Sequence, residues 1–135
     1  MLQYGYTILY EVYGMKIKES AENYLESILI IKNRKGFVRS IDVANELGVS
    51  KPSVSVAMKN FREEGYIKID EEGSISLTEK GLSVAEGIYE RHRAIASLLI
   101  SLGVDEETAY EDSCKIEHDI SEKTFEKIKE YLSKL

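Results

Sequence analysis

The chain has 135 residues, of which 43% are hydrophobic, and a formal net charge of -6 at pH 7. This length suits one compact domain, or a small domain with an appendage, and it can bury a core without disulfides. The acidic balance argues against a nonspecific nucleic-acid binder, and the single cysteine excludes an internal disulfide, so we expect a reducing, cytoplasmic setting.

The first 14 residues, MLQYGYTILYEVYG, are apolar and rich in tyrosine. They lack a basic start and a small-residue cleavage site, and they are too short to span a bilayer, so we expect neither an export signal nor a membrane anchor. Residues 1–14 are interpreted as an N-terminal extension of unknown role, either a short strand or arm or the product of a misplaced start codon.

Three helices are predicted in the first half of the chain. The first begins at the N-cap Ser20 and runs to about Arg34. The second, within SIDVANELGVS, begins near Ser40 and stops at Gly48. The third, within SKPSVSVAMKNFREEG, begins after Ser50 with a proline in its first turn, where a missing N–H does no harm. The residues expected to face inward are Tyr24, Leu25, Ile28, Leu29, Ile31, Ile41, Val43, Ala44, Leu47, Val54, Ala57, Met58 and Phe61.

The second and third helices, joined by a three-residue turn with a glycine, form a helix-turn-helix pattern. YIKID and SISL then alternate apolar and polar residues around a turn at residues 71–73, which predicts a β-hairpin, the wing of a winged helix. Thr78 caps a long helix that ends at Gly103, and two further helices are expected over about residues 105–118 and 121–135. The long helix is expected to turn inward Leu82, Ala85, Ile88, Tyr89, His92, Ile95, Ala96 and Leu99.

The polar face of the third predicted helix is not needed for packing against the core. Its residues are therefore available to bind DNA. In a helix-turn-helix the second of the two helices lies in the major groove, with its N-terminal residues on base edges. Small hydroxyl side chains allow close approach, and the helix N-terminus and the lysines attract phosphate. The alternative is a module that binds protein or is purely structural. The candidate DNA-binding residues are Arg39, Lys51, Pro52, Ser53, Ser55, Lys59, Asn60 and Arg62.

Metal-ligand residue types gather in the second half of the chain. At helical spacing, Cys114, Glu117 and His118 lie on one face, and His92 lies on the long helix that must pack nearby. Thiolate, imidazole and carboxylate groups together suit a transition metal. The alternative is a small buried cysteine beside two solvated surface residues. Charge agrees with a cation site, because residues 81–135 carry 7 Lys and Arg against 12 Asp and Glu.

Taken together, these segments resemble the diphtheria toxin repressor family, bacterial metal-dependent regulators that include the iron-dependent repressors and the shorter manganese transport regulators. The resemblance runs from about Ser20 to the C-terminus. The motifs that carry it are SAENYLESI, SIDVANELGVSKPSVSVAMKNF, LTEKG, ERHRAIASLL and GVDEETAYEDSCKIEHDIS. The last motif is the most specific, because the family has a cysteine or glutamate there followed by x-x-Glu-His.

The resemblance implies a ligand set for a divalent metal ion, Mn(II) or Fe(II). This set comprises Asn23, Glu26, His92, Cys114, Glu117 and His118. Cys114 matches the iron branch of the family, Glu26 matches the manganese branch, and Asn23 matches neither, since those branches favour Met or Asp there. An amide oxygen is a neutral ligand and weaker than a carboxylate. Ala96 and Tyr110 stand where the iron branch has ancillary ligands, so we do not expect a complete second site of that type.

The patterns and the resemblance together predict a mostly α fold in two domains. A winged helix-turn-helix DNA-binding domain spans residues 15–80, and a helical metal-binding and dimerisation domain spans residues 81–135. The resemblance implies a repressor of metal-uptake genes that binds palindromic double-stranded DNA as a homodimer when metal fixes the spacing of the two recognition helices. No membrane partner or organic cofactor is expected.

Two other classes of function are alternatives to this interpretation. The first is a metal-independent winged-helix regulator of the MarR type, which would respond to an organic ligand or to oxidation of Cys114. The second is a small metallohydrolase with Glu117 as general base. We expect no enzyme, because the sequence has no glycine-rich phosphate loop, no HExxH motif and no nucleophile with a partner base.

Overall fold

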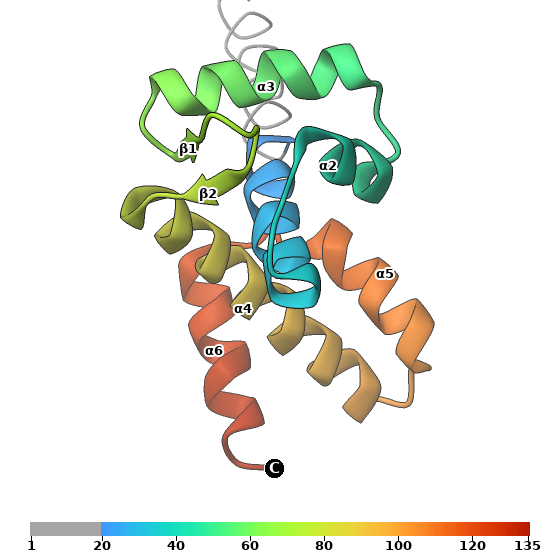
Figure 1. Cartoon of the computed structure of the whole chain (residues 1–135). Coiled ribbons are helices and arrows are strands. Elements are labelled where there is room, and N and C mark those ends of the chain that lie inside the picture. The colour runs from blue at the N-terminus through green and yellow to red at the C-terminus, as the bar shows by residue number, and fades with distance from the viewer. Residues whose placement is uncertain (1–19) are drawn as a thin grey trace, which may run out of the picture. The chain divides into compact units, whose positions relative to one another are not determined.

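The computed structural model describes residues 20–135, so the N-terminal extension expected over residues 1–14 lies outside the described residues. The fold is mostly helical with one two-stranded sheet, as predicted (Figure 1). The chain divides after Ala85 into two compact units, here called the first unit and the second unit.

The first unit contains a helix over residues 20–35, a helix-turn-helix and a hairpin. Its further elements are α2 (Ser40–Leu47), α3 (Lys51–Glu63), β1 (Ile67–Ile69) and β2 (Ile75–Leu77). Helix α4 (Glu79–Ser101) begins in the first unit and continues into the second, which also holds α5 (Glu106–Ile116) and α6 (Glu122–Leu132).

Local capping explains the helix-turn-helix. Gly48 ends α2 with φ 64°, a left-handed conformation that glycine adopts without steric cost, and its N–H donates to the Ala44 carbonyl. Ser50 then caps α3, since its hydroxyl accepts from the Ser53 N–H at 3.3 Å. Helix α3 contacts both α2 and β1, so the two caps fix the turn that presents α3.

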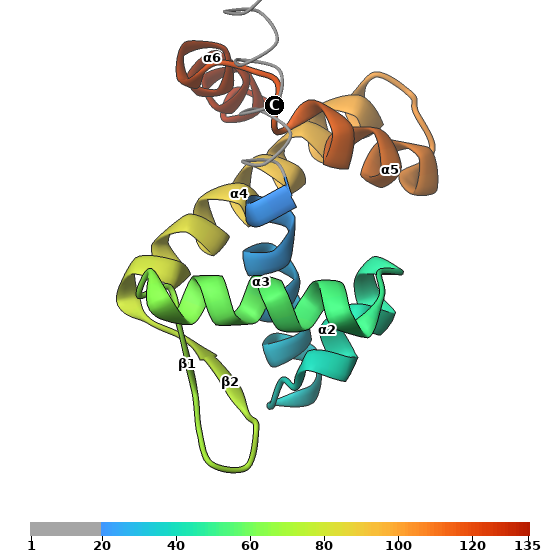
Figure 2. The same ribbon diagram turned by 90° about the horizontal axis from the view of Figure 1, so that it is seen from above.

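The hairpin pairs two short antiparallel strands, with Ile67 opposite Leu77 and Ile69 opposite Ile75. Ile67 and Ile75 are buried, which anchors the strands to the core of the first unit. Asp70 holds the turn, because its Oδ1 accepts from the N–H groups of residues 72 and 74. Figure 2 shows this hairpin extending away from α3 as a wing.

The hairpin and the start of α4 are joined closely. The Thr78 hydroxyl donates to the Gly65 carbonyl at 2.6 Å and accepts from the Gly81 N–H at 3.2 Å. Lys80 donates to the Glu64 carbonyl and lies 4.1 Å from the centroid of the Tyr66 ring. Gly81 itself is buried against the Tyr66 backbone, so the helix start fits only a residue without a side chain.

The buried residues largely follow the predicted helix faces. In the first unit they are Leu25, Ile28, Leu29, Ile31, Val38, Val43, Ala44, Val54, Met58, Phe61, Ile67, Ile75 and Ala85. In the second unit they include Ile88, Ile95, Ala96, Ala109 and Phe125. Two predicted core residues are wrong, since Ile41 is 41% exposed and Leu82 is 36% exposed. Ile41 lies about 60° around α2 from the buried Ala44, and Leu82 about 40° around α4 from the buried Ala96. Both positions therefore stand at the edge of the buried stripe, where helical spacing alone does not decide burial.

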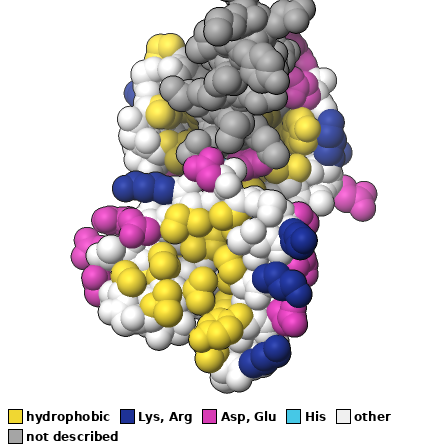
Figure 3. Space-filling model, turned by 180° about the vertical axis from the view of Figure 1, so that it is seen from behind, with side chains coloured by type: hydrophobic (Ala, Val, Ile, Leu, Met, Phe, Trp, Pro, Cys, Tyr) yellow, Lys and Arg dark blue, Asp and Glu magenta, His cyan; other side chains and the backbone are white. Residues whose placement is uncertain are grey.

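The second unit carries apolar side chains on its surface as well as in its core. Figure 3 shows hydrophobic side chains gathered over the lower half of one face, which this unit forms. Its exposed large hydrophobic residues are Ile100, Leu102, Tyr110, Tyr131 and Leu135. Within residues 20–135, no helix combines the length and apolarity needed to cross a membrane.

Candidate metal centre and nucleic-acid interface

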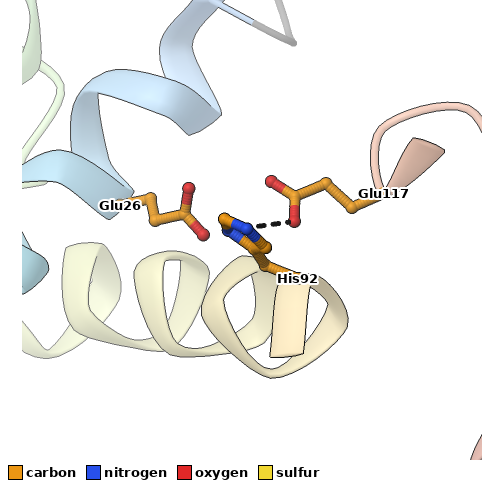
Figure 4. A group of neighbouring side chains, drawn as sticks. All are labelled: Glu26, His92 and Glu117. Atoms are coloured by element: carbon orange, nitrogen blue, oxygen red, sulfur yellow. Dashed lines mark ion pairs between the residues drawn. The ribbon is translucent and has the colours of Figure 1, made fainter. Parts of the chain in front are cut away.

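The second unit brings together four of the six predicted metal ligands. His92 lies on α4, Cys114 on α5, and Glu117 and His118 follow α5 directly. The Cys114 Sγ lies 3.3 Å from the Nε2 atom of His92 and 3.7 Å from its Nδ1 atom. Glu117 Oε2 lies 3.7 Å from His92 Nδ1, the pair drawn in Figure 4, and Glu117 Oε1 lies 3.4 Å from His118 Nε2.

Cys114, Glu117 and His118 were predicted to lie on one helix, but only Cys114 lies within α5. Helix α5 ends at Ile116, not at His118 as predicted. Glu117 keeps helical dihedral angles, and its N–H donates to the Ser113 carbonyl at 3.0 Å, so it stays one turn from Cys114. His118 falls in the turn that follows, where the Asp119 N–H bonds back three residues to Ile116. The cluster therefore includes a helix end, and its geometry depends on that turn.

A backbone carbonyl contributes to the orientation of His92. The Nε2 atom lies 3.2 Å from the Tyr110 carbonyl oxygen, and the Tyr110 ring packs edge-on against the imidazole with centroids 5.6 Å apart. In the tautomer that donates from Nε2 to this carbonyl, the Nδ1 lone pair is directed toward other groups. Metal-binding histidines in proteins commonly use such a carbonyl to fix their tautomer.

The chemistry of the cluster fits a divalent transition metal. The Glu117 carboxylate is fully buried, and the His118 side chain is only 2% exposed. Ligand atoms that share one ion lie roughly 3–3.7 Å apart when the metal distances are about 2.1–2.3 Å. The separations of three pairs, His92–Cys114, His92–Glu117 and Glu117–His118, fall in this range. Their nitrogen, sulfur and oxygen donors are the types that Fe(II), Mn(II) and Zn(II) bind.

The remaining two predicted ligands, Asn23 and Glu26, belong to the first unit. Both lie on the helix over residues 20–35, three residues apart, so they share one helix face. Glu26, which is also labelled in Figure 4, is 6% exposed.

All eight predicted DNA-binding residues are exposed in the first unit. Seven of them belong to α3, whose apolar residues Val54, Met58 and Phe61 are buried on the opposite side. Arg39 precedes α2, where its backbone N–H donates to the Asp42 carboxylate. A hydrogen bond from Lys35, followed by this one from Arg39, lowers the pKa of Asp42. The helix-turn-helix therefore offers a polar and basic surface on α3.

One residue on this surface was missed by the sequence analysis. Val56 is 61% exposed, although it lies on α3 among polar neighbours. An apolar side chain on the outer face of a recognition helix suits contact with a thymine methyl group in the major groove. The signal was present in the sequence, because Val56 falls off the helical spacing of the buried positions.

A winged helix-turn-helix followed by a helical unit with neighbouring candidate metal ligands is the arrangement of a metal-dependent DNA-binding regulator. The profile described as the iron dependent repressor N-terminal DNA binding domain matches residues 16–74. The profile of the iron dependent repressor metal binding and dimerisation domain matches residues 78–135. The chain belongs to the iron-dependent repressor family of metal-dependent transcriptional regulators.

Relatives and solved structures agree with this assignment. An uncharacterised HTH-type transcriptional regulator of Methanocaldococcus jannaschii is 34% identical over 87% of this chain and 96% of that protein. The transcriptional regulator MntR of Escherichia coli O6:H1 is 32% identical over 87% of this chain and 76% of that protein. The crystal structure of T. acidophilum IdeR superimposes with a TM-score of 0.75 at 26% identity, over 83% of this chain and 53% of that one.

These matches confirm the predicted family and the predicted class of function. They give no support to the metal-independent alternative of the MarR type, because the matched profiles describe a metal-binding domain. The named relatives are transcriptional regulators. The present chain spans about half the length of the IdeR structure that it resembles.

Proposed function

We propose that this protein is a cytoplasmic repressor of metal-uptake genes that binds palindromic operator DNA as a homodimer when Mn(II) or Fe(II) is bound. The observation that carries the proposal is a run of neighbouring donor groups in the second unit. Cys114 and Glu117 both lie next to the His92 ring, and Glu117 also lies next to His118. A buried carboxylate between two imidazoles, with a thiol against one of them, supplies the oxygen, nitrogen and sulfur donors that a divalent transition metal binds.

The full ligand set in this proposal joins both units of the chain. Asn23 and Glu26 provide oxygen ligands from the unit that carries α3, and the four residues of the cluster provide nitrogen, sulfur and oxygen ligands from the other. A bound cation supplies positive charge to this set. Metal binding then favours the arrangement of the units in which all the ligands reach the ion. The affinity for DNA can rise only as far as the metal binds this arrangement more tightly than the others.

A homodimer provides the two copies of α3 that a palindrome requires. Operator symmetry mirrors protein symmetry in helix-turn-helix regulators, and a single domain of this kind reads only a few base pairs. The apolar surface of the second unit supports self-association, since a contiguous exposed patch on a small domain usually marks an interaction site (Figure 3).

The proposed roles on α3 divide between base reading and phosphate contact. Ser53, Ser55 and Asn60 offer short hydrogen-bonding groups for base edges, and Val56 offers an apolar contact for a thymine methyl. The other exposed residues predicted to bind DNA are Arg39, Lys51, Pro52, Lys59 and Arg62. The charged members neutralise phosphates, so they raise affinity for any sequence and make it sensitive to salt.

Genomic capture tests the proposal directly. Purified protein is mixed with fragments of the source genome in the presence of Mn(II), of Fe(II) without oxygen, or of a chelator, and the bound fragments are sequenced. We expect a palindromic sequence to be enriched only when metal is present. Equal enrichment in the chelator would overturn the metal dependence, and no enrichment in any condition would overturn the DNA-binding role.

Replacing Cys114 with glutamate should shift metal preference toward Mn(II), because a carboxylate is a harder ligand than a thiolate. In competition titrations we expect the ratio of Mn(II) to Fe(II) affinity to rise at least about tenfold. A Cys114→Ser variant is the matched control, since it should weaken binding of both ions without favouring Mn(II). An unchanged ratio in Cys114→Glu would exclude Cys114 as a ligand.

A further inference from the structure

Arg91, on α4, donates hydrogen bonds to three residues of the second unit. Its guanidinium donates from Nη1 to the backbone carbonyls of Glu117 at 3.0 Å and Ile120 at 3.2 Å. From Nη2 it donates to the Glu122 carboxylate at 2.8 Å. The same group lies 5.1 Å from the centroid of the buried Phe125 ring. One side chain of α4 thus ties the end of α5 to the start of α6.

These bonds fall on the segment that carries two of the metal ligands. Carbonyl groups at the end of a helix have no partner within the helix and need an outside donor. Arg91 provides that donor for Glu117 and for Ile120, on either side of His118. The turn between α5 and α6 therefore takes its conformation in part from Arg91, and the Glu117 and His118 side chains project from that turn.

The position of Arg91 next to His92 makes the arrangement compact. Adjacent residues on a helix point about 100° apart. The same turn of α4 consequently presents the His92 ring to Cys114 and Glu117 while the Arg91 side chain holds the Glu117 backbone. One turn of α4 thus contacts Glu117 in two ways, through the imidazole beside its carboxylate and through the guanidinium on its backbone carbonyl.

The three hydrogen bonds of the Arg91 guanidinium differ in their exposure to water, and so in their contribution to stability. The Glu122 side chain is 73% exposed, and an exposed ion pair contributes little to stability. Arg91 itself is only 16% exposed, so its bonds to the two carbonyls are shielded from water. A planar guanidinium can serve both carbonyls and the carboxylate at once, whereas a lysine ammonium lacks this fixed fork.

We propose that Arg91 is a positioning residue for the metal centre, which sets the geometry of Glu117 and His118 without touching the metal. This inference rests on the proposed function, because it assumes that the cluster binds a cation. It differs from a purely structural role in what it predicts: metal affinity and the coordination spectrum change, while folding of the metal-free protein is retained.

Co(II) titration of the full chain tests this proposal, with absorption bands from the metal and from the Cys114 thiolate as the readout. We expect Arg91→Ala to bind Co(II) about 10–100-fold more weakly, with altered bands, as for other residues that orient metal ligands. Arg91→Lys should recover only part of the loss. Glu122→Gln removes the exposed ion pair alone and should stay within about threefold of the native affinity.

Arg93→Ala is the matched control, since Arg93 lies on the same helix two residues away and its guanidinium packs on Tyr89. Thermal unfolding in chelator identifies any variant that fails to fold, in which case Arg91→Lys carries the comparison. Native Co(II) affinity and bands in Arg91→Ala, or in Arg91→Lys if that variant is used alone, would overturn the proposal. Absence of Co(II) binding by the native chain would instead overturn the proposed function.

Discussion

Replacing Glu117 with glutamine is expected to abolish metal-dependent DNA binding. The Glu117 carboxylate is fully buried and lies within 3.7 Å of His92 and 3.4 Å of His118. Glutamine keeps the shape of the side chain but removes the negative charge, and a neutral amide is a weaker ligand. We expect metal affinity to fall by more than about 100-fold. Fluorescence anisotropy of labelled operator DNA, titrated with Mn(II) and with Fe(II), measures the loss.

The matched control is Glu111→Gln, which makes the same change in charge on the exposed surface of α5. This variant should bind metal and DNA as the native protein does. Circular dichroism in chelator shows whether Glu117→Gln retains the helical fold. A folded Glu117→Gln variant that still binds operator only with metal would show that Glu117 is not a ligand.

A Gly81→Ala substitution should destabilise the protein more than any other glycine replacement within residues 20–135. A Cβ atom at Gly81 would overlap the Tyr66 carbonyl oxygen and press on the Leu77 side chain. Backbone atoms cannot move aside as a flexible side chain can, so the hairpin and the start of α4 must separate. We expect a loss of about 3 kcal/mol in the free energy of unfolding, and a melting temperature lower by roughly 10 °C.

Gly87→Ala, six residues along the same helix, provides the contrast. A Cβ atom at Gly87 meets nothing within 4 Å, and alanine is the better helix former. This variant should gain about 0.5–1 kcal/mol in the free energy of unfolding. Chemical denaturation of the two variants and the native chain measures both changes. Similar effects of the two substitutions would contradict the packing described at Gly81.

Helix boundaries in this chain were predictable because the signals that end helices are local. Ser50 and Gly48 determine the turn of the helix-turn-helix through their own hydroxyl and backbone conformation. The end of α5 was predicted two residues too late. Its termination involves Arg91, which bonds to carbonyls 26 and 29 residues along the chain. No local pattern carries that information, since the contact exists only after α4 and α5 have packed.

In the candidate site, too, residue types and spacing were predictable from the sequence, whereas contacts that form only after packing were not. Residue types and spacing indicated that Cys114, Glu117, His118 and His92 could share a cation. In the second unit Cys114 and Glu117 lie next to His92, and His118 lies next to Glu117. The role of the Tyr110 carbonyl beside His92 could not be predicted, because a backbone group leaves no mark in the residue pattern. The participation of Asn23 and Glu26 stays a prediction that rests on the family resemblance.

The hairpin described above has a consequence for how this protein searches a genome. Its tip carries three consecutive carboxylates, Asp70, Glu71 and Glu72, all exposed. DNA phosphates repel such a tip, so we expect the wing to add no attraction to arbitrary DNA and to leave the proposed DNA contacts to α3. We expect the residence time on unrelated sequence to be short. Together with the overall charge of -6, this should leave more unbound protein to occupy the few operator sites.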